Sequence, residues 1–476
     1  MRDFLPEDVR RRQYVIDVVR RVYERYGFEP LETPTLENIE TLTGKYGEEG
    51  DKLLYKVLRR GEGEASGGTD LALRYDLTVP LARVVADNRG KLPKFFKRYQ
   101  IQPVWRADRP QRGRFREFYQ CDVDAIGSTS PVVEVEMIAA VSDVLQALGF
   151  TDFAVQLNHR QLLTAMLDTA GIETGRHGDA LIAIDKLDKI GRDGVTKDLA
   201  ARGIDEAIAR TCLDAFEDVA AFDRLIAASE AGVSARANVT AIMKLADATP
   251  AKGHIQFTPR LARGLSYYTG AIMEITVPDL AGSLGGGGRY DGLIGMFSGE
   301  QIPACGFSLG LERILVVMGE RNMFPGDLQS SGPDVLVTVF EEALAAESLR
   351  LATELRAGGF RVEMYPDPLR GGKDLGKAFK YADARRARFV AVLGQDEIAR
   401  GEVKIKELGT GPWDSDWPNP TAYPAIDEWP GNERYFSIRT SPMASEFTIH
   451  QNLAPAAAIY GFLCAEQPAP VASKAK

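Results

Sequence analysis

The residues best suited to chemistry form a short basic segment in the first quarter of the chain. Five arginines fall within the eleven residues Arg106–Arg116. The wider stretch Arg89–Arg116 holds ten lysines or arginines and one acidic residue, although the formal net charge of the chain is −9. A guanidinium group binds phosphate in a forked, two-point geometry. This local reversal of charge therefore predicts a site for a polyanionic ligand.

Acceptor side chains follow the arginines at even spacing. The stretches FFKRYQIQPVWRA and REFYQCDVDAIG predict two strands around the basic loop. The loop is too short for a helical crossover, so these strands should be antiparallel. Gln120, Asp122 and Asp124 would share one strand face, and buried acceptors need a donor from a ligand or a cation. Arg106 is expected on the strand just before the loop, where a structural ion pair is an equally good interpretation. The arginines of the loop, Arg114 among them, would by default be solvated charges.

Two further segments carry polar groups in an apolar frame. In LALRYDLTVPLAR the residues Arg74, Asp76 and Thr78 alternate, which predicts another polar strand face, with a structural salt bridge as an equal alternative. The segment LARGLSYYTG sets Arg263 before two tyrosines, a pattern that alone fits any tyrosine-rich turn.

Four consecutive glycines at 285–288 are expected in a turn that lets the backbone approach a ligand closely. They do not form a phosphate loop, because GK[ST] is absent. They do not form a dinucleotide-binding turn either, because no GxGxxG opens a helix after a parallel strand. The glycines alone are therefore a weak signal.

Length and composition bound the class of protein. At 476 residues the chain predicts two or three domains, and 45% hydrophobic with 26% charged residues is typical of a soluble globular protein. Four scattered cysteines form no CxxC pair, and four histidines lie out of helical reach of one another. These patterns argue against disulfides, zinc and a histidine-rich metal site, and leave metal ligands unassigned. The N-terminus is unlike a secretory signal, and no apolar run approaches the length of a membrane span. We expect a cytoplasmic protein.

The periodicity of the chain predicts two domains and a tail. Residues 1–325 predict an α+β domain built on an antiparallel sheet, which begins with a long amphipathic helix at 7–27 and contains a helical insertion at about 160–248. Residues 333–411 alternate strand and helix, which predicts a small α/β domain with a largely parallel sheet. The tail, 412–476, is either an extension packed on the second domain or a disordered segment, and its Ala- and Pro-rich end favours disorder.

Taken together, these segments resemble the class II histidyl-tRNA synthetase family over roughly residues 1–411. KRYQIQPVWRADRPQRGRFREFYQCDVD is similar to the second class II motif in its histidyl form, and GFSLGLERI to the third motif. LARGLSYYTG and GGGGRYDGLIGMFSG resemble the two histidine-specific blocks. The family usually reads RGLDYYTG, so Ser266 departs from it, and we expect little effect because Arg263 and Tyr268 are kept. The family also usually has a few residues before RDFLP, which here begins at Met1 and leaves a shortened N-terminus open.

The resemblance implies a fold and a reaction. The first domain would be a class II synthetase-like catalytic domain and the second an anticodon-binding domain. The enzyme would be a histidine–tRNA ligase that joins L-histidine to ATP as an adenylate, releases pyrophosphate and transfers histidine to the 3′ end of tRNA(His). ATP would be a substrate accompanied by Mg²⁺. The chain would form a homodimer through its first helix and the ETPTLE segment, and no editing domain is expected.

The resemblance also assigns roles to single residues. The catalytic arginines would be Arg106, Arg263 and Arg313. ATP would bind to Arg106, Arg114, Glu312 and Arg313, with Glu312 helping to place magnesium. Histidine would bind to Asp76, Thr78, Gln120, Asp124, Tyr267 and Tyr268. The acceptor end of the tRNA would meet Arg109 and Gln111, and the anticodon stem would meet the basic set that includes Lys373, Lys377 and Lys380.

Two other functions compete with this interpretation. The first is a noncatalytic, histidine-sensing regulatory subunit of ATP phosphoribosyltransferase built on the same catalytic fold. Such relatives generally lack the C-terminal domain and erode the histidine-specific arginine block, and this chain keeps both. The second is a class II enzyme for another amino acid, which the RGLSYYTG block disfavours.

Overall fold

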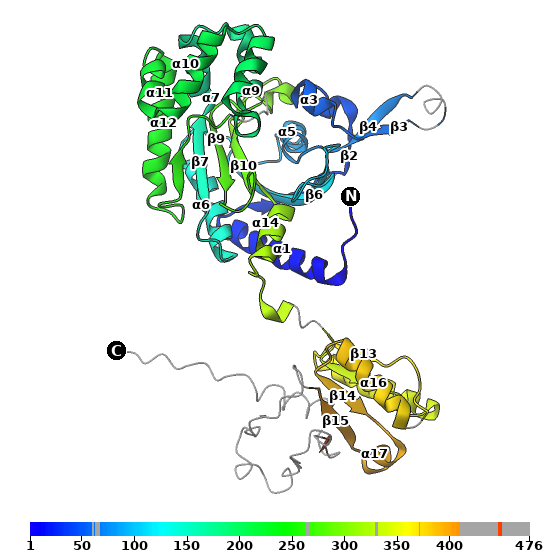
Figure 1. The fold of residues 1–476 in the computed structure, drawn as a ribbon. Helices are drawn as coiled ribbons and strands as arrows, with labels where there is room; N and C mark the ends of the chain where they lie inside the picture. The colour runs from blue at the N-terminus through cyan, green and yellow to red at the C-terminus, as the bar shows by residue number, and fades with distance from the viewer. Residues whose placement is uncertain are drawn as a thin grey trace. The chain divides into compact units, whose positions relative to one another are not determined.

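The chain forms two compact units, Met1–Phe324 and Pro325–Lys476 (Figure 1). This computed structural model describes residues 1–59, 61, 67–262, 267–328, 332–370, 372–408 and 446–449. Within those residues, no helix is both long and apolar enough to cross a membrane.

An eight-stranded sheet forms the centre of the first unit, in the order β1-β5-β6-β11-β10-β9-β7-β8. The five central pairings are antiparallel, as predicted, whereas the edge pairs β1–β5 and β7–β8 are parallel and were not predicted. The strands are β1 (Glu29–Pro30), β5 (Phe96–Trp105), β6 (Glu117–Ile126), β7 (Ala154–His159), β8 (Ile255–Phe257), β9 (Ala271–Thr276), β10 (Gly285–Arg289) and β11 (Ala304–Gly310).

Strands β5 and β6 confirm the antiparallel pair predicted around the basic loop. Their register sets Arg98 opposite Asp124 and Gln100 opposite Asp122. Because side chains alternate along a strand, the even-numbered polar residues of β6 share one face, while Val123 is buried on the other. The strand pair therefore places polar groups on one side of the sheet and apolar groups on the other.

Three helices cover the apolar face of the sheet: α1 (Pro6–Arg25), α6 (Val132–Ala147) and α14 (Leu311–Glu320) (Figure 1). The predicted first helix is confirmed, with a proline and two acids in its first turn, which suit the helix N-terminus. Its buried side chains end with Tyr23, whose hydroxyl donates to Cys121 O at 3.2 Å. The helix is thereby fixed to β6 behind the polar face.

Helical sequence after β7 folds into a group of helices, as the periodicity predicted. Three helices begin at a capping side chain: Asp205, Asp218 and Ser229 each accept from a backbone N–H of the first turn. The elements are α7 (Arg160–Thr169), η1 (Thr174–Arg176), α8 (His177–Ile184), α9 (Leu187–Ala201), α10 (Glu206–Glu217), α11 (Val219–Ile226) and α12 (Glu230–Ala246).

The four glycines at 285–288 form strand β10, so the predicted turn is wrong. A Cβ at Gly285 or Gly287 would collide with the backbone carbonyls of β11, Ser308 O and Gly306 O respectively. The sheet packs its backbones too closely here for any side chain. Glycine was needed for space between neighbouring strands, not for a turn.

The predicted strand face at 74–78 is also wrong. Strand β4 (Thr69–Leu73) ends before this segment, and Thr78 is the first residue of helix α5 (Thr78–Asp87). Asp76 Oδ1 accepts from Val79 N at 3.0 Å, so this side chain satisfies a free donor at the start of the helix. Arg74 is buried, and its guanidinium donates to Pro103 O and Thr33 O at 2.8 and 2.6 Å. Local capping chemistry therefore overrides the alternating pattern.

A small sheet and short helices stand beside the central sheet. The small sheet has the order β2-β4-β3 and consists of β2 (Leu36–Asn38), β3 (Lys56–Leu58) and β4 (Thr69–Leu73), all antiparallel. The short helices are α2 (Ile39–Leu42), α3 (Gly47–Asp51) and α13 (Gly295–Ser298). Helix α5 packs against α2 and α13.

The second unit is an α/β fold with a five-stranded sheet in the order β13-β12-β14-β15-β16. The first three strands pair in parallel, but β15 and β16 are added antiparallel. The prediction of a largely parallel sheet is therefore correct for only two of the four strand pairings described. The link from β14 to β15 is too short for a full crossover. The elements are η2 (Gly326–Leu328), β12 (Val335–Val337), η3 (Glu342–Leu344), α15 (Ala345–Ala357), β13 (Val362–Met364), α16 (Gly372–Ala384), β14 (Phe389–Val392), α17 (Gln395–Arg400), β15 (Val403–Glu407) and β16 (Glu446–Ile449).

The tail contributes one described element, β16, which pairs antiparallel with β15. No strand was predicted for this segment. The remainder of 412–476 lies outside the described residues, and so does the expectation of disorder for it.

Candidate active site

A cavity opens on the polar face of the central sheet, and the predicted ligand-binding residues line it. They come from the turn that leads into α5, from the loop between β5 and β6, from β6 itself, from the segment before β9 and from the start of α14. The predicted residues that line the cavity are Asp76, Thr78, Arg106, Arg114, Gln120, Asp124, Tyr267, Tyr268, Glu312 and Arg313. Arg263 falls in the segment 263–266, outside the described residues.

One end of the cavity is cationic. The Arg106 guanidinium lies over the Tyr75 ring, 4.3 Å from its centroid, and its Nε donates to Tyr75 O at 3.0 Å. Arg313 donates to Ser283 O. The Nε of Arg114 stands 3.7 Å from an Asp108 carboxylate oxygen. Backbone and ring contacts thus hold Arg106 in place, and its remaining donors can meet an anion.

A single buried carboxylate accompanies these arginines. Both oxygens of Glu312 accept from Tyr119 N, at 3.1 and 3.0 Å. Burial raises the pKa of Glu312 to about 7, against the lowering effect of the Tyr119 hydrogen bond. Within the described parts of the chain, no group of three or more His, Cys, Asp or Glu residues could hold a metal ion. Glu312 is therefore at most one ligand of a metal that brings other ligands with it.

The opposite end of the cavity is acidic. Asp124 is buried and receives the Tyr290 hydroxyl at Oδ1, while Arg98 Nη2 lies 2.8 Å from Oδ2. Burial raises the pKa of Asp124, against the lowering effects of Arg98 and Tyr290. Burial likewise raises the pKa of Asp122 to about 7, and the neighbouring Asp124 charge adds to that rise. This end is suited to a ligand that donates hydrogen bonds.

A second acceptor stands where α5 begins. Asp76 Oδ1 accepts from the Tyr46 hydroxyl at 3.0 Å and from the helix N-terminus, while Oδ2 is buried without a hydrogen-bond partner among the described residues. Burial raises the pKa of Asp76, against the lowering effect of the Val79 N–H. Thr78 shares a hydrogen bond with Tyr267. An ammonium group of a ligand would satisfy the remaining Asp76 oxygen.

Gln120 connects the cationic and acidic ends of the cavity. Its Nε2 donates to Ser308 Oγ at 2.7 Å, and Ser308 in turn hydrogen-bonds Asp122. Its Oε1 is buried and has no partner in the described part of the protein. The network fixes the amide with its oxygen left to accept from a ligand.

Glycines form the wall of the cavity beside Asp124. A Cβ at Gly306 would collide with Asp124 Oδ1, and one at Gly288 would lie 2.8 Å from the Tyr268 ring. The glycines therefore make room for the Asp124 carboxylate and for Tyr268. The predicted close approach of the glycine backbone at 285–288 to a ligand stays a prediction.

Several residues of the site were not predicted from the sequence. They are Arg98, Tyr46, Tyr290 and Ser308, which contact Asp124, Asp76 or Gln120. For Arg98 a signal existed, because it shares a strand face with the polar residues of β5. Tyr290 lies in the block GGGGRYDGLIGMFSG, so a signal existed for it as well, although no role was assigned to it. Tyr46 reaches the site only through the tertiary fold, and no local pattern identifies it.

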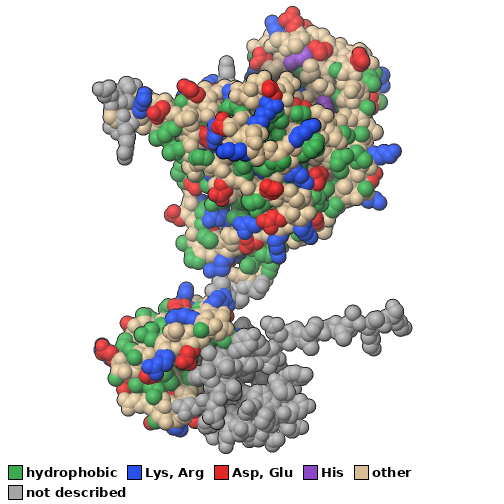
Figure 2. All heavy atoms as spheres, turned by 180° about the vertical axis from the view of Figure 1, so that it is seen from behind, with side chains coloured by type: hydrophobic (Ala, Val, Ile, Leu, Met, Phe, Trp, Pro, Cys, Tyr) green, Lys and Arg blue, Asp and Glu red, His purple; other side chains and the backbone are tan. Residues whose placement is uncertain are grey.

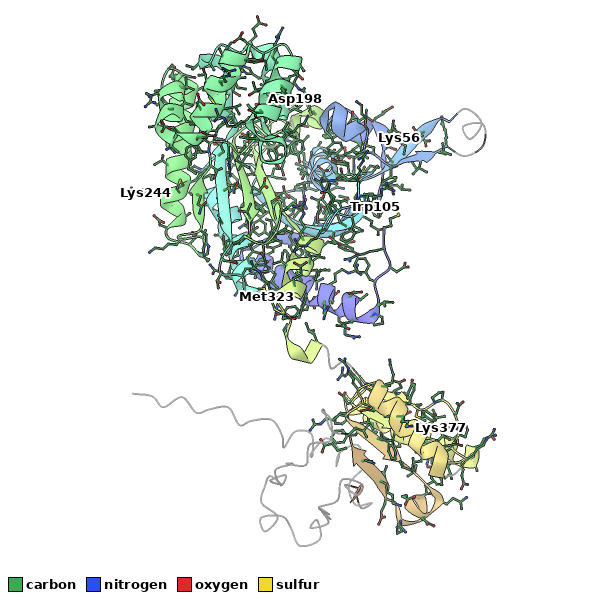
Figure 3. The ribbon with its side chains drawn as sticks, viewed as in Figure 1. Lys56, Trp105, Asp198, Lys244, Met323 and Lys377 are labelled. Carbon is green, nitrogen blue, oxygen red and sulfur yellow. The ribbon has the colours of Figure 1, made fainter. Side chains whose placement is uncertain are left out.

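The residues predicted to meet tRNA lie away from the cavity lining. Arg109 and Gln111 are exposed in the loop between β5 and β6, which closes on a backbone bridge between Gln111 and Arg114. In the second unit, Lys377 lies on the surface of α16, 72% exposed, and pairs with Asp374 at 2.8 Å (Figure 3). Lys380 is on the same helix and also exposed. The Lys373 side chain is outside the described residues.

Comparison with known families and proteins gives a consistent result. The family described as histidyl-tRNA synthetase matches residues 1–314, and the family described as anticodon binding domain matches residues 334–412. The histidine–tRNA ligase of Porphyromonas gingivalis is 43% identical over 437 residues, which cover 86% of this chain and 94% of that protein. That of Cytophaga hutchinsonii is 39% identical over 434 residues, with the same coverage.

Solved structures agree with the family matches. The crystal structure of histidyl-tRNA synthetase from Nostoc sp. PCC 7120 has a TM-score of 0.68 at 29% identity and covers 85% of this chain and 93% of that chain. An ATP phosphoribosyltransferase regulatory subunit/histidyl-tRNA synthetase from Bacillus halodurans is alike in fold, with a TM-score of 0.65 at 24% identity and coverage of 80% and 94%. The predicted fold class is confirmed, and the regulatory alternative is less supported than the ligase. The chain belongs to the histidyl-tRNA synthetase family of class II aminoacyl-tRNA ligases.

Proposed function

We propose that the cavity of the first unit activates L-histidine with ATP and then charges tRNA(His). The observation that carries the proposal is the polarity of the cavity, with arginines at one end and buried acceptors at the other. ATP requires cations, whereas the α-amino group and the imidazole of histidine are hydrogen-bond donors. The two ends therefore match the two parts of a histidyl-adenylate.

Activation brings two anions together. An oxygen of the histidine carboxylate forms a bond to the α-phosphorus, the bond between that phosphorus and the β-phosphate bridging oxygen breaks, and pyrophosphate leaves. The enzyme needs positioning and positive charge for this step, and no general base. Arg106, Arg114 and Arg313 would bind the phosphates. Arg263, by resemblance, would bridge the carboxylate and the α-phosphate.

Magnesium would arrive with the nucleotide. Mg²⁺ is usually held by one or two carboxylates together with substrate phosphates, and Glu312 is the carboxylate at the arginine end. When bound, the ion would neutralise phosphate charge. The described residues offer no set of ligands that would hold a metal without the nucleotide.

Histidine would be recognised at each of its polar groups. Asp76 and Thr78 would receive the α-amino group, and Gln120 would lie on the carboxylate side. Asp124 and Tyr268 would bind the imidazole. A site that hydrogen-bonds the distinguishing group of its substrate rejects analogues without it by about 10⁴ to 10⁵, so editing is not required.

The second step transfers histidine to RNA. A terminal ribose hydroxyl of tRNA(His) attacks the adenylate carbonyl, the bond to phosphate breaks, and AMP leaves. Arg109 and Gln111 would meet the acceptor end, because they lie exposed in the loop beside the cavity. Lys373, Lys377 and Lys380 would meet the anticodon stem through phosphate contacts, which weaken as salt rises.

The proposal extends to assembly and location. A homodimer would form through α1 and the segment ETPTLE, as the class II resemblance implies, and sedimentation of an active monomer would contradict it. A cytoplasmic location is supported by the cysteines, since Cys121, Cys212 and Cys305 are free and buried.

Exchange of labelled pyrophosphate into ATP tests the activation step. We expect exchange with histidine and with none of the other amino acids. Replacing Arg263 by His should reduce exchange by about 10²-fold or more, the scale for one lost preorganised donor. Histidine binding without exchange would assign the chain to the regulatory class, and normal exchange by Arg263→His would remove that arginine from the mechanism.

A further inference from the structure

We propose that Arg98 is a positioning residue for histidine selection: it keeps the Asp124 carboxylate charged and directed into the cavity, so that this carboxylate accepts an imidazole N–H. The inference rests on the proposed function, in which Asp124 receives the imidazole. No role implied by the sequence falls on Arg98, and its side chain does not line the cavity. Its effect on the substrate must therefore pass through the acids in front of it.

Arg98 is completely buried and acts mainly through one nitrogen. Its Nη2 lies 2.8 Å from Asp124 Oδ2 and 4.0 Å from an oxygen of Asp122, and it donates to Leu77 O at 3.3 Å. This contact with Asp124 is an ion pair whose geometry is not that of a hydrogen bond, and Oδ2 accepts no other hydrogen bond within the described residues. Arg98 thus supplies charge to Oδ2 and leaves its lone pairs for a ligand donor.

Burial of Arg98 at this position lowers the stability of the fold. Two of its donors, Nε and Nη1, are buried without a partner in the described ranges. A buried donor without an acceptor destabilises a fold, and such exceptions in native proteins call for an explanation. If this position had only a structural role, an apolar side chain of similar size would give a fold of equal or higher stability. The charge itself is what the site requires.

Asp122 and Asp124 share this cation, which also acts on Asp76, where burial raises the pKa and Arg98 is one of the charges that oppose the rise. Asp122 and Asp124 are both buried and both line the cavity, so their charges repel each other across a medium of low dielectric. The pKa of Asp122 is raised to about 7 even with Arg98 in place, so loss of the cation would favour protonation of Asp124 as well. A protonated Asp124 would present a hydrogen where the imidazole also presents one, and the contact would be lost.

The titratable groups around Asp124 come from several elements. Asp122 lies on its own strand, Arg98 on β5 and Tyr290 just after β10, whereas Cys305 on β11 and Tyr23 on α1 lie behind it on the apolar side of the sheet and interact with it electrostatically. Burial raises the pKa of both tyrosines and of the thiol, so all three are neutral near pH 7. Arg98 and Asp122 are therefore the two charges that decide the state of Asp124.

The central experiment measures kcat/KM for histidine against pH in Arg98→Met. Loss of the cation raises the pKa of Asp124, so the active carboxylate disappears at a higher pH, and the acid limb should move up by about one pH unit or more. The KM for histidine should rise by about 10-fold to 10²-fold, while that for ATP stays near the wild-type value. Protonation of free histidine is common to all variants, so the difference between variants reports the enzyme.

Two variants supply the controls. Arg98→Lys keeps the charge and should leave the acid limb where the wild type has it. Asp122→Asn removes the competing acid, so it should move the acid limb to lower pH in the wild-type background and restore part of the histidine affinity in Arg98→Met. Asp122→Asn retains Arg98, so it tests the inference even if Arg98→Met fails to fold.

The failures are distinguishable. If the wild type lacks histidine-dependent exchange, or if Asp124→Asn leaves the histidine KM unchanged, the proposed function is wrong. If both behave as expected but Arg98→Met raises the KM values for histidine and ATP equally, Arg98 is a structural residue. An acid limb that stays fixed in both Arg98→Met and Asp122→Asn would overturn the inference in the same way.

Discussion

The cavity of the first unit and the basic surface of the second use the same kinds of charged residue in opposite ways. In the first, Arg98, Asp122 and Asp124 are buried together beside the cavity. In the second, cations such as Lys377 and Arg361 are exposed, and each has an acid within 2.8 Å. Figure 2 shows basic and acidic side chains interspersed over the surface. Water and salt weaken the exposed pairs, whereas the buried groups interact more strongly because the effective dielectric constant around them is lower.

The difference between exposed and buried charges indicates which of them can fix the geometry of a ligand-binding site. A surface pair contributes about 0–1 kcal/mol and responds to salt, so it serves long-range attraction better than fixed geometry. A buried ionic group is costly and persists where geometry and charge state matter to a ligand. The cavity of the first unit is thus suited to the selective binding of a small molecule, and the surface of the second unit to weak, salt-dependent binding of a large polyanion.

The largest expected effect compares two ion pairs directly. In the first unit, Arg289 binds Glu134 through two buried contacts of 2.6 and 2.8 Å. Glu134→Gln should lower the free energy of unfolding by about 3–5 kcal/mol, because it leaves the buried guanidinium with only the partly exposed Asp291, at 3.2 Å, as a charged partner. The partly exposed pair of Arg361 and Asp334 should lose at most about 1 kcal/mol in Asp334→Asn. Denaturant titration of each variant measures both, and equal losses would break the comparison.

The next effect concerns catalysis at the cationic end. Arg106→Gln should lower histidine-dependent pyrophosphate exchange by about 10²-fold to 10³-fold, because a preorganised donor to the phosphates is lost. Arg350→Gln, on the exposed face of α15, is the matched control and should leave exchange unchanged. Retention of exchange by Arg106→Gln would mean that this arginine supports the Tyr75 turn and not the phosphates.

A smaller effect separates the two substrates. Asp124→Ala should raise the KM for histidine by about 10²-fold, the upper range for losing a hydrogen bond to a charged group. The KM for ATP should change little, because the acid lies at the other end of the cavity. Steady-state exchange with each substrate varied in turn gives both constants. Equal increases would argue against a contact with the imidazole.

The smallest effect belongs to the second unit. The double variant Lys377→Ala, Lys380→Ala should weaken tRNA charging several-fold and reduce the slope of log affinity against log salt by about 1 per lost phosphate contact. Pyrophosphate exchange, which needs no tRNA, should be unchanged. A change in exchange would show that these lysines matter for folding, and an unchanged salt slope would remove them from the tRNA surface.

The elements that position the site were predictable where the signal is local. Strands β5 and β6 and helices α1, α6 and α14 follow from apolar periodicity over ten or more residues. The turn at Asp76 was misread because alternation over five residues cannot distinguish a short strand from a helix start. Strand β10 was predicted wrongly because its glycines are required by close contact with the backbone of β11, and this contact forms only when the sheet assembles.

The site residues that lie in a sequence motif could be predicted, whereas those placed by the pairing of strands could not. Arg106, Gln120 and Asp124 lie within a recognisable motif, and the structure brings them into one cavity. Arg98 and Tyr290 depend on strand register and on which side chains meet across the sheet. Register is a property of the folded sheet as a whole, so the sequence pattern can indicate that these residues are polar and share a face but not which acid they contact.

The glycine wall has a consequence for how the protein tolerates variation. Every replacement of glycine adds at least a Cβ, so at Gly285, Gly287, Gly288 and Gly306 even alanine meets backbone or a functional side chain. Gly292 and Gly319 have open space at the same position. A scan of all single substitutions would therefore show the first group depleted for all nineteen alternatives, and the second group accepting alanine, although all six residues look alike in composition.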